Sequence, residues 1–137
     1  MSDGKEKRRF RWKRAVEFSE CDPAGVAHFT TLLKLAEAAE HAWWRELGLA
    51  GEFFDLEKHA WPRVAVTGEF LGPVQFGDLV GVTIEVAKLG GSSIGYRAVL
   101  EMDRGEKVAV VEWTVVYVKI AEQQASGLPD RVREAFE

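Results

Sequence analysis

Apolar and polar residues alternate near the start of the chain. Between Phe10 and Phe18, large apolar side chains are separated mostly by charged or small polar ones. A period of two is typical of a strand with one buried and one solvated face. We predict that this strand ends in the segment 20–25, where Pro23 lacks a backbone N–H and Gly25 permits unusual dihedrals.

The pattern changes to a spacing of three and four residues in the next segment. Leucines, alanines and Trp43 recur at this spacing, and Gly48 stands where glycine commonly follows a helix end. The pattern predicts a helix from about Phe29 to Leu47, roughly 27 Å long. Its middle faces carry alanines, so we expect a thin helix that lies close to a sheet or is wrapped by one.

A period of two returns from Arg63 onward and predicts four further strands. Their apolar positions lie within 64–70, 80–86, 94–102 and 108–120. The turn signals between them are Gly72-Pro73, Phe76-Gly77-Asp78, Gly90-Gly91-Ser92-Ser93 and Asp103-Arg104-Gly105-Glu106. We expect the last strand to be the longest. It is apolar on both faces, so we expect the helix to cover one face and another subunit the other.

One long helix and five strands place the chain in the α+β class. A chain of 137 residues forms one domain, and we expect that domain to span 1–137. The sequence contains no internal repeat, and we expect a short terminal helix at most after Pro129.

The composition is that of a soluble globular protein, with 47% hydrophobic and 29% charged residues. A single cysteine, Cys21, excludes an internal disulfide and fits a reducing compartment, so we expect a cytoplasmic protein. No apolar run approaches the roughly 18 residues of a membrane span.

The charge is distributed unevenly along the chain. The first fourteen residues hold seven basic and two acidic side chains, whereas the remaining chain holds eleven and twenty. Nucleic-acid binding is one interpretation of the basic start. The alternation with aromatic residues favours another, a flexible basic tail over 1–9 leading into a strand with a basic outer face, and we expect no nucleic-acid partner.

The segment from Asp22 to Phe29 is the strongest candidate for chemistry, because it joins a strand end to a helix start. The first turn of a helix offers unpaired N–H groups that can hold an oxyanion. A carboxylate a few residues upstream can act as a base or nucleophile on the same centre. The spacing alone leaves a second interpretation open, in which Asp22 merely caps the turn.

Other candidates are weaker. Cys21 and His28 lack a third orienting group, and the three histidines lack metal-ligand spacing, so we expect no metal. Asp78 is interpreted as a turn residue. Three tryptophans are candidates for an acyl pocket, although a place in the core or an interface is favoured: Trp43, Trp44 and Trp61.

The motif Asp22-Pro23-Ala24-Gly25-Val26, followed by an aromatic residue and a long helix, resembles the 4-hydroxybenzoyl-CoA thioesterase-like family of hotdog-fold thioesterases. The resemblance extends from about Arg11 to Pro129. It implies a five-stranded sheet wrapped around the helix and hydrolysis of an acyl-CoA thioester. It also implies no cofactor beyond the coenzyme A of the substrate, and a homodimer or homotetramer with its active site at the dimer interface.

The resemblance also assigns roles to residues. It implies that Asp22 is the catalytic nucleophile or general base and that the backbone N–H of Phe29 polarises the thioester carbonyl. The implied substrate-binding residues are Gly25, His28, Glu37, Gly91 and Ser92. Glu37 would face the acyl end of the pocket, and Glu37 or Glu40 is the alternative catalytic carboxylate.

The chain departs from the family at three places, one of which is His28, displaced by one position from the histidine of the Tol–Pal-associated relatives. Relatives commonly have tyrosine or histidine at the position of Phe29, so only a backbone role survives there. The basic cluster of the benzoyl-type relatives reads Gly90-Gly91-Ser92 here. The substitute candidates for a coenzyme A phosphate contact are Lys88, Arg97 and Arg63.

Two other functions stay open. A hotdog dehydratase or hydratase pairs a histidine with an acid, and only His28 is near. The second is a non-catalytic module that binds an acyl ligand or a protein. An unpaired carboxylate such as Asp22 argues against it, because burying a charge beside an apolar ligand is unfavourable.

Overall fold

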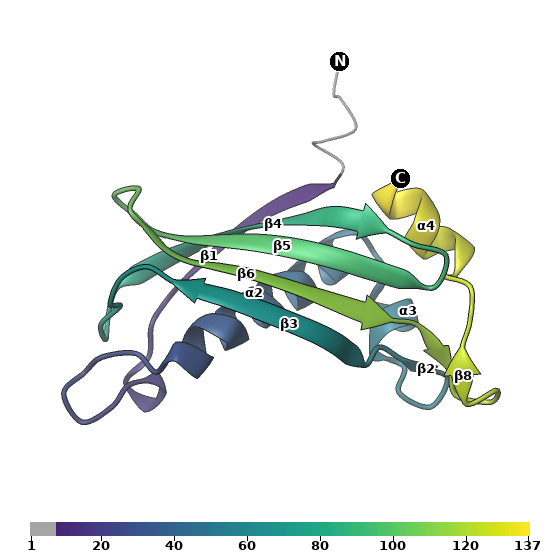
Figure 1. The fold of residues 1–137 in the computed structure, drawn as a ribbon, viewed down its shortest axis with the longest axis horizontal. Coiled ribbons are helices and arrows are strands. Elements are labelled where there is room, and N and C mark those ends of the chain that lie inside the picture. The colour runs from purple at the N-terminus through teal and green to yellow at the C-terminus, as the bar shows by residue number, and fades with distance from the viewer. Residues whose placement is uncertain (1–7) are drawn as a thin grey trace, which may run out of the picture.

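The main feature of the computed structural model, which describes residues 8–137, is a five-stranded antiparallel sheet curved around one long helix (Figure 1). The helix α2 spans Phe29–Glu46. The strands in spatial order are β1 (Arg9–Ala15), β4 (Leu79–Leu89), β5 (Ser93–Met102), β6 (Lys107–Val116) and β3 (Arg63–Phe70). This confirms the predicted α+β architecture of a sheet wrapped around a central helix.

The sheet order follows from how the chain crosses it. β3 pairs with β6, with Val66 opposite Trp113, and the chain then crosses to β4, which pairs with β1 and β5. Buried and half-buried residues alternate along β4 up to Val86 and along β5. The buried set faces α2, whose alanines allow the close approach that the sequence predicts. β1 and β3 form the two edges of the sheet.

The first predicted strand is shorter than expected. β1 ends at Ala15, and Phe18–Glu20 forms a 3-10 turn, η1, in which the Glu20 carboxylate accepts from the N–H of Glu17 at 2.9 Å. Phe18 is therefore exposed rather than buried.

The last predicted strand was also extended too far. β6 ends at Val116, and the longest strand is β4 with eleven residues. Beyond β6 the chain forms a small second sheet from β2 (His59–Ala60), β7 (Val118–Lys119) and β8 (Gln124–Ala125).

Two short helices complete the fold. The sequence pattern did not predict α3 (Ala50–Phe54), whereas α4 (Asp130–Phe136) is the expected terminal helix. The ring of Phe136 packs 4.9 Å from Trp43 and 5.6 Å from Trp44, centroid to centroid. α4 thus closes the core at the C-terminal end of α2.

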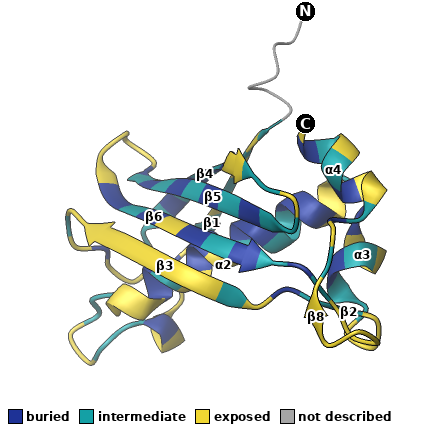
Figure 2. Cartoon of the chain, turned by 45° about the vertical axis from the view of Figure 1, so that its right-hand side comes forward, coloured by how far each residue is buried: buried dark blue, intermediate teal, exposed yellow. Residues whose placement is uncertain are grey.

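The second face of the last strand is less apolar than expected. The odd-numbered residues from Ala109 to Val115, including Trp113, are buried, whereas Glu112 is exposed in the middle of the other face and lies 4.0 Å from Arg97. The exposed apolar surface lies on β3 instead (Figure 2). Val64 is 60% and Phe70 44% exposed.

The basic outer face expected for the first strand is present. Arg9, Arg11 and Lys13 are exposed on β1, and two of them pair with acids, Arg9 with Glu85 at 3.3 Å and Lys13 with Asp103 at 3.6 Å. Of the predicted tail 1–9, residues 1–7 lie outside the described residues, and Arg9 already belongs to β1. No helix within residues 8–137 is both long and apolar enough to cross a membrane.

Candidate active site

A narrow loop joins η1 to the start of α2 and holds Asp22 close to the helix. Cys21 and Ala27 form an antiparallel bridge, and the N–H of Asp22 donates to the carbonyl of Val26 at 2.9 Å. Gly25 sits at the tip with φ of +82°, where a side chain would strain the backbone. The two ends of the loop therefore lie side by side, which brings Asp22 near the first turn of α2.

The two oxygens of the Asp22 carboxylate have different surroundings. Its Oδ1 accepts hydrogen bonds from the N–H groups of Ala24 at 2.9 Å and Val26 at 3.0 Å. This is the turn-capping role that the sequence left open. Its Oδ2 accepts no hydrogen bond from any of the residues 8–137, and the side chain is half-buried. One oxygen thus orients the carboxylate while the other is available for chemistry.

The start of α2 presents unpaired backbone donors. His28 is the N-cap residue, and its side chain makes no capping hydrogen bond. The carbonyl of His28 accepts from Thr31, but the N–H of Phe29 has no acceptor in the described part of the chain. A donor in the first turn of a helix also lies at the positive end of the helix dipole. This N–H can therefore stabilise a negative oxygen.

Glu20 holds the loop in place through its carboxylate and its backbone carbonyl. Arg14 donates to both of its carboxylate oxygens, at 3.0 and 2.7 Å, and Lys34 lies 3.2 Å away. The hydrogen bonds from Arg14 lower the pKa of Glu20 to about 2, against the effect of burial. The backbone carbonyl of Glu20 accepts from the Thr31 hydroxyl at 2.7 Å. The loop is therefore tied to both β1 and α2.

The other candidate residues near the loop and the helix have structural roles. Asp78 accepts from the N–H of Gln75 at 2.8 Å, as expected for a turn residue. The Cys21 thiol donates to the carbonyl of Glu17 at 3.6 Å, and burial together with nearby carboxylates raises its pKa, which disfavours a thiolate. The three tryptophans of the helix and its flank are buried in the core, as favoured: Trp43, Trp44 and Trp61.

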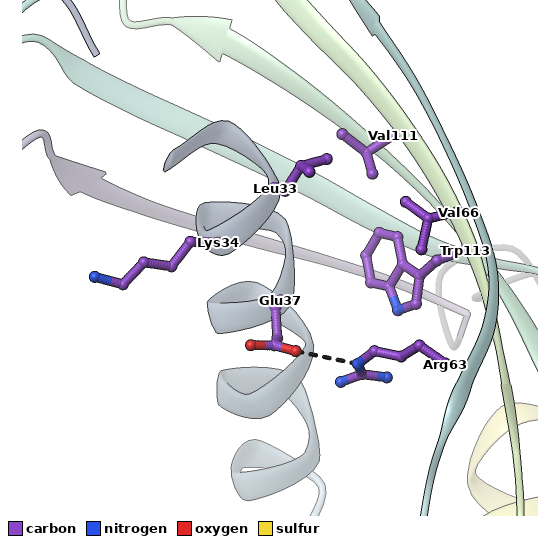
Figure 3. Close-up of a pocket in the computed structure, with 7 residues that line it drawn as sticks. All are labelled: Leu33, Lys34, Glu37, Arg63, Val66, Val111 and Trp113. Atoms are coloured by element: carbon purple, nitrogen blue, oxygen red, sulfur yellow. Dashed lines mark hydrogen bonds and ion pairs between the residues drawn. The ribbon is translucent and has the colours of Figure 1, made fainter. Parts of the chain in front are cut away.

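A cavity of about 180 Å³ opens between α2 and the sheet (Figure 3). Its walls are mainly apolar, and its polar side chains are those of Lys34, Glu37 and Arg63. The remaining lining residues are Leu33, Val66, Val111 and Trp113. Phe29, Leu33 and Glu37 follow one another at four-residue spacing, so they share one face of α2. Phe29 does not line the cavity, but it precedes Leu33 by about one turn on this face, so the cavity begins about one helical turn beyond the free Phe29 N–H.

The polar end of the cavity is an ion-pair network. Arg63 Nε donates to Glu37 Oε2 at 3.0 Å, and its Nη2 donates to Glu40 Oε1 at 2.5 Å. Glu40 is fully buried, whereas the Glu37 side chain is 48% exposed. Arg63 thus bridges the core and the cavity, and it is already neutralised by two carboxylates.

Burial dominates the titration of Glu40. Desolvation raises its pKa to about 7, against the opposing effect of Arg63. Desolvation disfavours the Arg63 cation too, yet the two glutamates outweigh it and raise the arginine pKa. Burial governs Glu40, because none of its side chain is exposed whereas the Arg63 side chain is 25% exposed. Burial likewise raises the pKa of Tyr96 and lowers that of His41 beside this network.

Not all predicted binding residues lie together within one protomer. Gly91 and Ser92 form the turn between β4 and β5, where their carbonyls accept from Leu128 and Tyr117. This turn and the Asp22 loop lie at opposite ends of the sheet (Figure 1). Of the substitute cations, Lys88 is exposed on β4, Arg97 lies near Glu112, and Arg63 is paired as described.

Sequence reasoning missed three residues of this region or their roles. Glu20 was passed over as part of a turn, and Arg63 was considered only for phosphate. The sequence pattern gives Trp113 no role beyond an apolar face of the last strand, whereas the structure shows that it lines the cavity. The one available signal was the position of Arg63 directly before three apolar residues, 64–66, which the sequence alone does not connect to the helical glutamates.

Comparison with known proteins gives a consistent picture. Residues 16–136 match the family model of the thioesterase-like superfamily. The 1,4-dihydroxy-2-naphthoyl-CoA hydrolase of Thermosynechococcus vestitus is 28% identical over 120 residues, which cover 87% of this chain and 82% of that protein.

Solved structures share the fold. A 1,4-dihydroxy-2-naphthoyl-CoA thioesterase from Synechocystis superposes with a TM-score of 0.86 at 20% identity, covering 93% of this chain and 95% of the other. A gentisyl-coenzyme A thioesterase superposes with a TM-score of 0.83 at 23% identity, covering 93% and 100%. The arrangement of sheet and helix is therefore the hotdog fold.

Proposed function

This chain belongs to the thioesterase-like superfamily of thioester hydrolases, and we propose that it hydrolyses an aromatic acyl-CoA to a free acid and coenzyme A. The names of the similar proteins specify 1,4-dihydroxy-2-naphthoyl-CoA and gentisyl-CoA as their substrates. The largely apolar cavity beside α2 supports an aromatic acyl group here as well, because such walls remove a ring from water.

Asp22 and the Phe29 N–H divide the chemical work in this proposal. Asp22 Oδ2 either attacks the carbonyl carbon or takes a proton from a water that attacks it. The carbonyl oxygen becomes negative and accepts from the Phe29 N–H. The C–S bond then breaks, and the coenzyme A sulfur leaves as a thiolate that takes up a proton. In the nucleophile route, water then hydrolyses the resulting anhydride and frees Asp22.

One observation carries the proposal: the loop from Cys21 to Ala27 holds a carboxylate with a free oxygen next to a helix start with a free N–H. A carboxylate oxygen and an oxyanion donor held this close together are the two groups that hydrolysis of a thioester needs. The dehydratase alternative would pair a histidine with an acid, but the His28 side chain is exposed and bonded to none of the residues 8–137.

The direct test is Asp22→Asn. Asparagine keeps the Oδ1 acceptor for Ala24 and Val26, so we expect the loop to keep its conformation. Thiol release from aryl-CoA substrates should fall by about a hundredfold or more, the scale of a positioned acid or base. The matched control is Asp78→Asn, the same change at a neighbouring turn, which should retain normal turnover. Near-normal turnover by Asp22→Asn would transfer the role to Glu37 or Glu40.

We also propose that the protein works as a homodimer or a higher assembly of dimers. The edge strand β3 exposes Val64, Val66 and Phe70, and the adjacent Leu71 is 54% exposed. An exposed apolar edge readily pairs with another strand, and a two-fold symmetric pair is the commonest solution. In this assembly, Gly91 and Ser92 could approach a substrate only from the second copy.

A further inference from the structure

We propose that the indole N–H of Trp113 determines specificity by donating a hydrogen bond to a hydroxyl oxygen on the acyl group. This inference rests on the proposed function, since it places the acyl group in the cavity beside α2. It adds a residue that neither the sequence nor the similar proteins indicate.

The first observation is an unpaired buried donor. Trp113 is 6% exposed, and its Nε1 has no hydrogen-bond partner among residues 8–137. Buried tryptophans usually find a partner for this group. Two others in this protein do so: Trp44 donates to the Tyr96 hydroxyl at 2.9 Å and Trp61 to the carbonyl of Glu52 at 3.0 Å. An unsatisfied buried donor costs stability, so its retention suggests a partner that arrives with the substrate.

The second observation is where this donor points. Trp113 lines the cavity, and the nitrogen edge of its ring faces the polar end with Glu37 and Arg63 (Figure 3). Both of these side chains line the same cavity as the indole. Glu37 is 48% exposed on its helix, so it can rotate and admit a ligand atom. The indole N–H is thus aimed at the place where a substituent of a bound ring would lie.

The length of the cavity fits this position. Glu37 lies eight residues beyond Phe29, roughly 12 Å along the helix axis. Its side chain tilts back toward the N-terminus, which shortens the gap. A thioester carbonyl held at the Phe29 N–H can therefore place a single aromatic ring in between. A substituent on the far side of that ring reaches Trp113, whereas one adjacent to the carbonyl does not.

The donor and the charges at the polar end of the cavity determine which substituent on the aromatic ring can bind there. An indole nitrogen can only donate, so the group must accept. A carboxylate is disfavoured, because Arg63 is already paired with both Glu37 and Glu40 and offers no uncompensated positive charge. A neutral hydroxyl fits, since its oxygen can accept from Trp113 while its proton remains available to a carboxylate.

The test compares three substrates: benzoyl-CoA, 4-hydroxybenzoyl-CoA and 2-hydroxybenzoyl-CoA. We expect the wild-type protein to prefer the 4-hydroxy compound by kcat/KM. Trp113→Phe keeps an aromatic ring but removes the N–H, and it should reduce that preference by roughly tenfold, the upper range for one neutral hydrogen bond. Loss of ring packing should lower kcat/KM for all three substrates alike, so the readout is the ratio of kcat/KM for 4-hydroxybenzoyl-CoA to that for benzoyl-CoA and for 2-hydroxybenzoyl-CoA.

The matched control is Trp61→Phe, the same change at a buried tryptophan outside the cavity. It should lower stability without altering the preference among substrates. A Trp113→Phe protein that keeps the full 4-hydroxy preference, or that loses activity equally on all three substrates, overturns the inference while leaving the thioesterase function in place. A wild-type protein that hydrolyses none of the three refutes the function itself, and the inference with it.

A second measurement does not depend on the variant folding. In wild-type protein labelled with ¹⁵N-tryptophan, saturating 4-hydroxybenzoate should shift one indole N–H proton downfield, and benzoate should not. Identical indole spectra with the two acids would contradict the proposed hydrogen bond.

Discussion

Glu40→Gln tests whether burial or the Arg63 ion pair controls the buried carboxyl group. Glutamine has the same shape and keeps an oxygen for Arg63, but it cannot ionise. Burial raises the pKa of Glu40 from 4.5 to about 7. The folded protein therefore binds this proton more tightly than the unfolded chain does, and the wild type loses stability as the pH rises through this range.

The magnitude follows from the shift. A displacement from 4.5 to about 7 corresponds to roughly 3 kcal/mol of unfolding free energy at 1.36 kcal/mol per pH unit. The effect is absent well below pH 4.5, grows between pH 4.5 and 7, and is constant above that. Between pH 5 and pH 8, the wild type should lose roughly 2 to 3 kcal/mol relative to Glu40→Gln.

Urea unfolding at several pH values from 5 to 8 measures this difference, with both proteins at one concentration in case of dimerisation. His41 lies 4.0 Å from Glu40, and burial lowers its pKa, so it contributes a slope of opposite sign in the same range. Both proteins retain His41, and the difference between their curves removes its contribution. Parallel curves would refute the raised pKa. If the wild type instead becomes more stable relative to Glu40→Gln as the pH rises, Arg63 has a larger effect on the pKa of Glu40 than burial does.

Two further predictions concern the oxyanion donor and the assembly. Phe29→Leu should retain most of kcat. Phe29→Pro removes the N–H at a position where proline is tolerated, so its kcat should fall about a hundredfold. Thiol-release kinetics on the folded variants would reject the backbone donor if the two results were reversed. Sedimentation at micromolar concentration should show at least twice the 15.3 kDa of one chain, and Val64→Lys should shift the protein toward monomer. A wild type that sediments as a monomer would contradict the proposed assembly.

The sequence predicts an element well wherever one local period decides burial. β4 and β5 alternate cleanly, and α2 begins at Phe29 and ends within one residue of its predicted end. The Asp22 loop was also predictable as a site, because proline, glycine and the helix start are adjacent in the chain. Whether its residues have the proposed catalytic roles stays a prediction.

The sequence fails where the deciding contact is distant. Both faces of β6 carry apolar residues, so the period cannot tell which face meets α2. The pairing with β5 decides it: Trp113 stands opposite Tyr96, and the centroids of the two rings lie 5.0 Å apart. The same holds for Arg63 and Glu40, which are 23 residues apart in the chain and meet only when β3 joins β6.

The edge position of β3 connects the cavity to the proposed dimer. Arg63 and Val66 line the cavity from this strand, while Val64 and Phe70 expose apolar surface along the same edge. Exposed apolar edge strands invite aggregation, and proteins usually protect them with charges or a covering segment. A second copy paired along β3 would cover this surface and close the open side of the cavity in one contact. The composition of β3, which is poor for an isolated edge strand, is therefore explained if the substrate binds beside an interface.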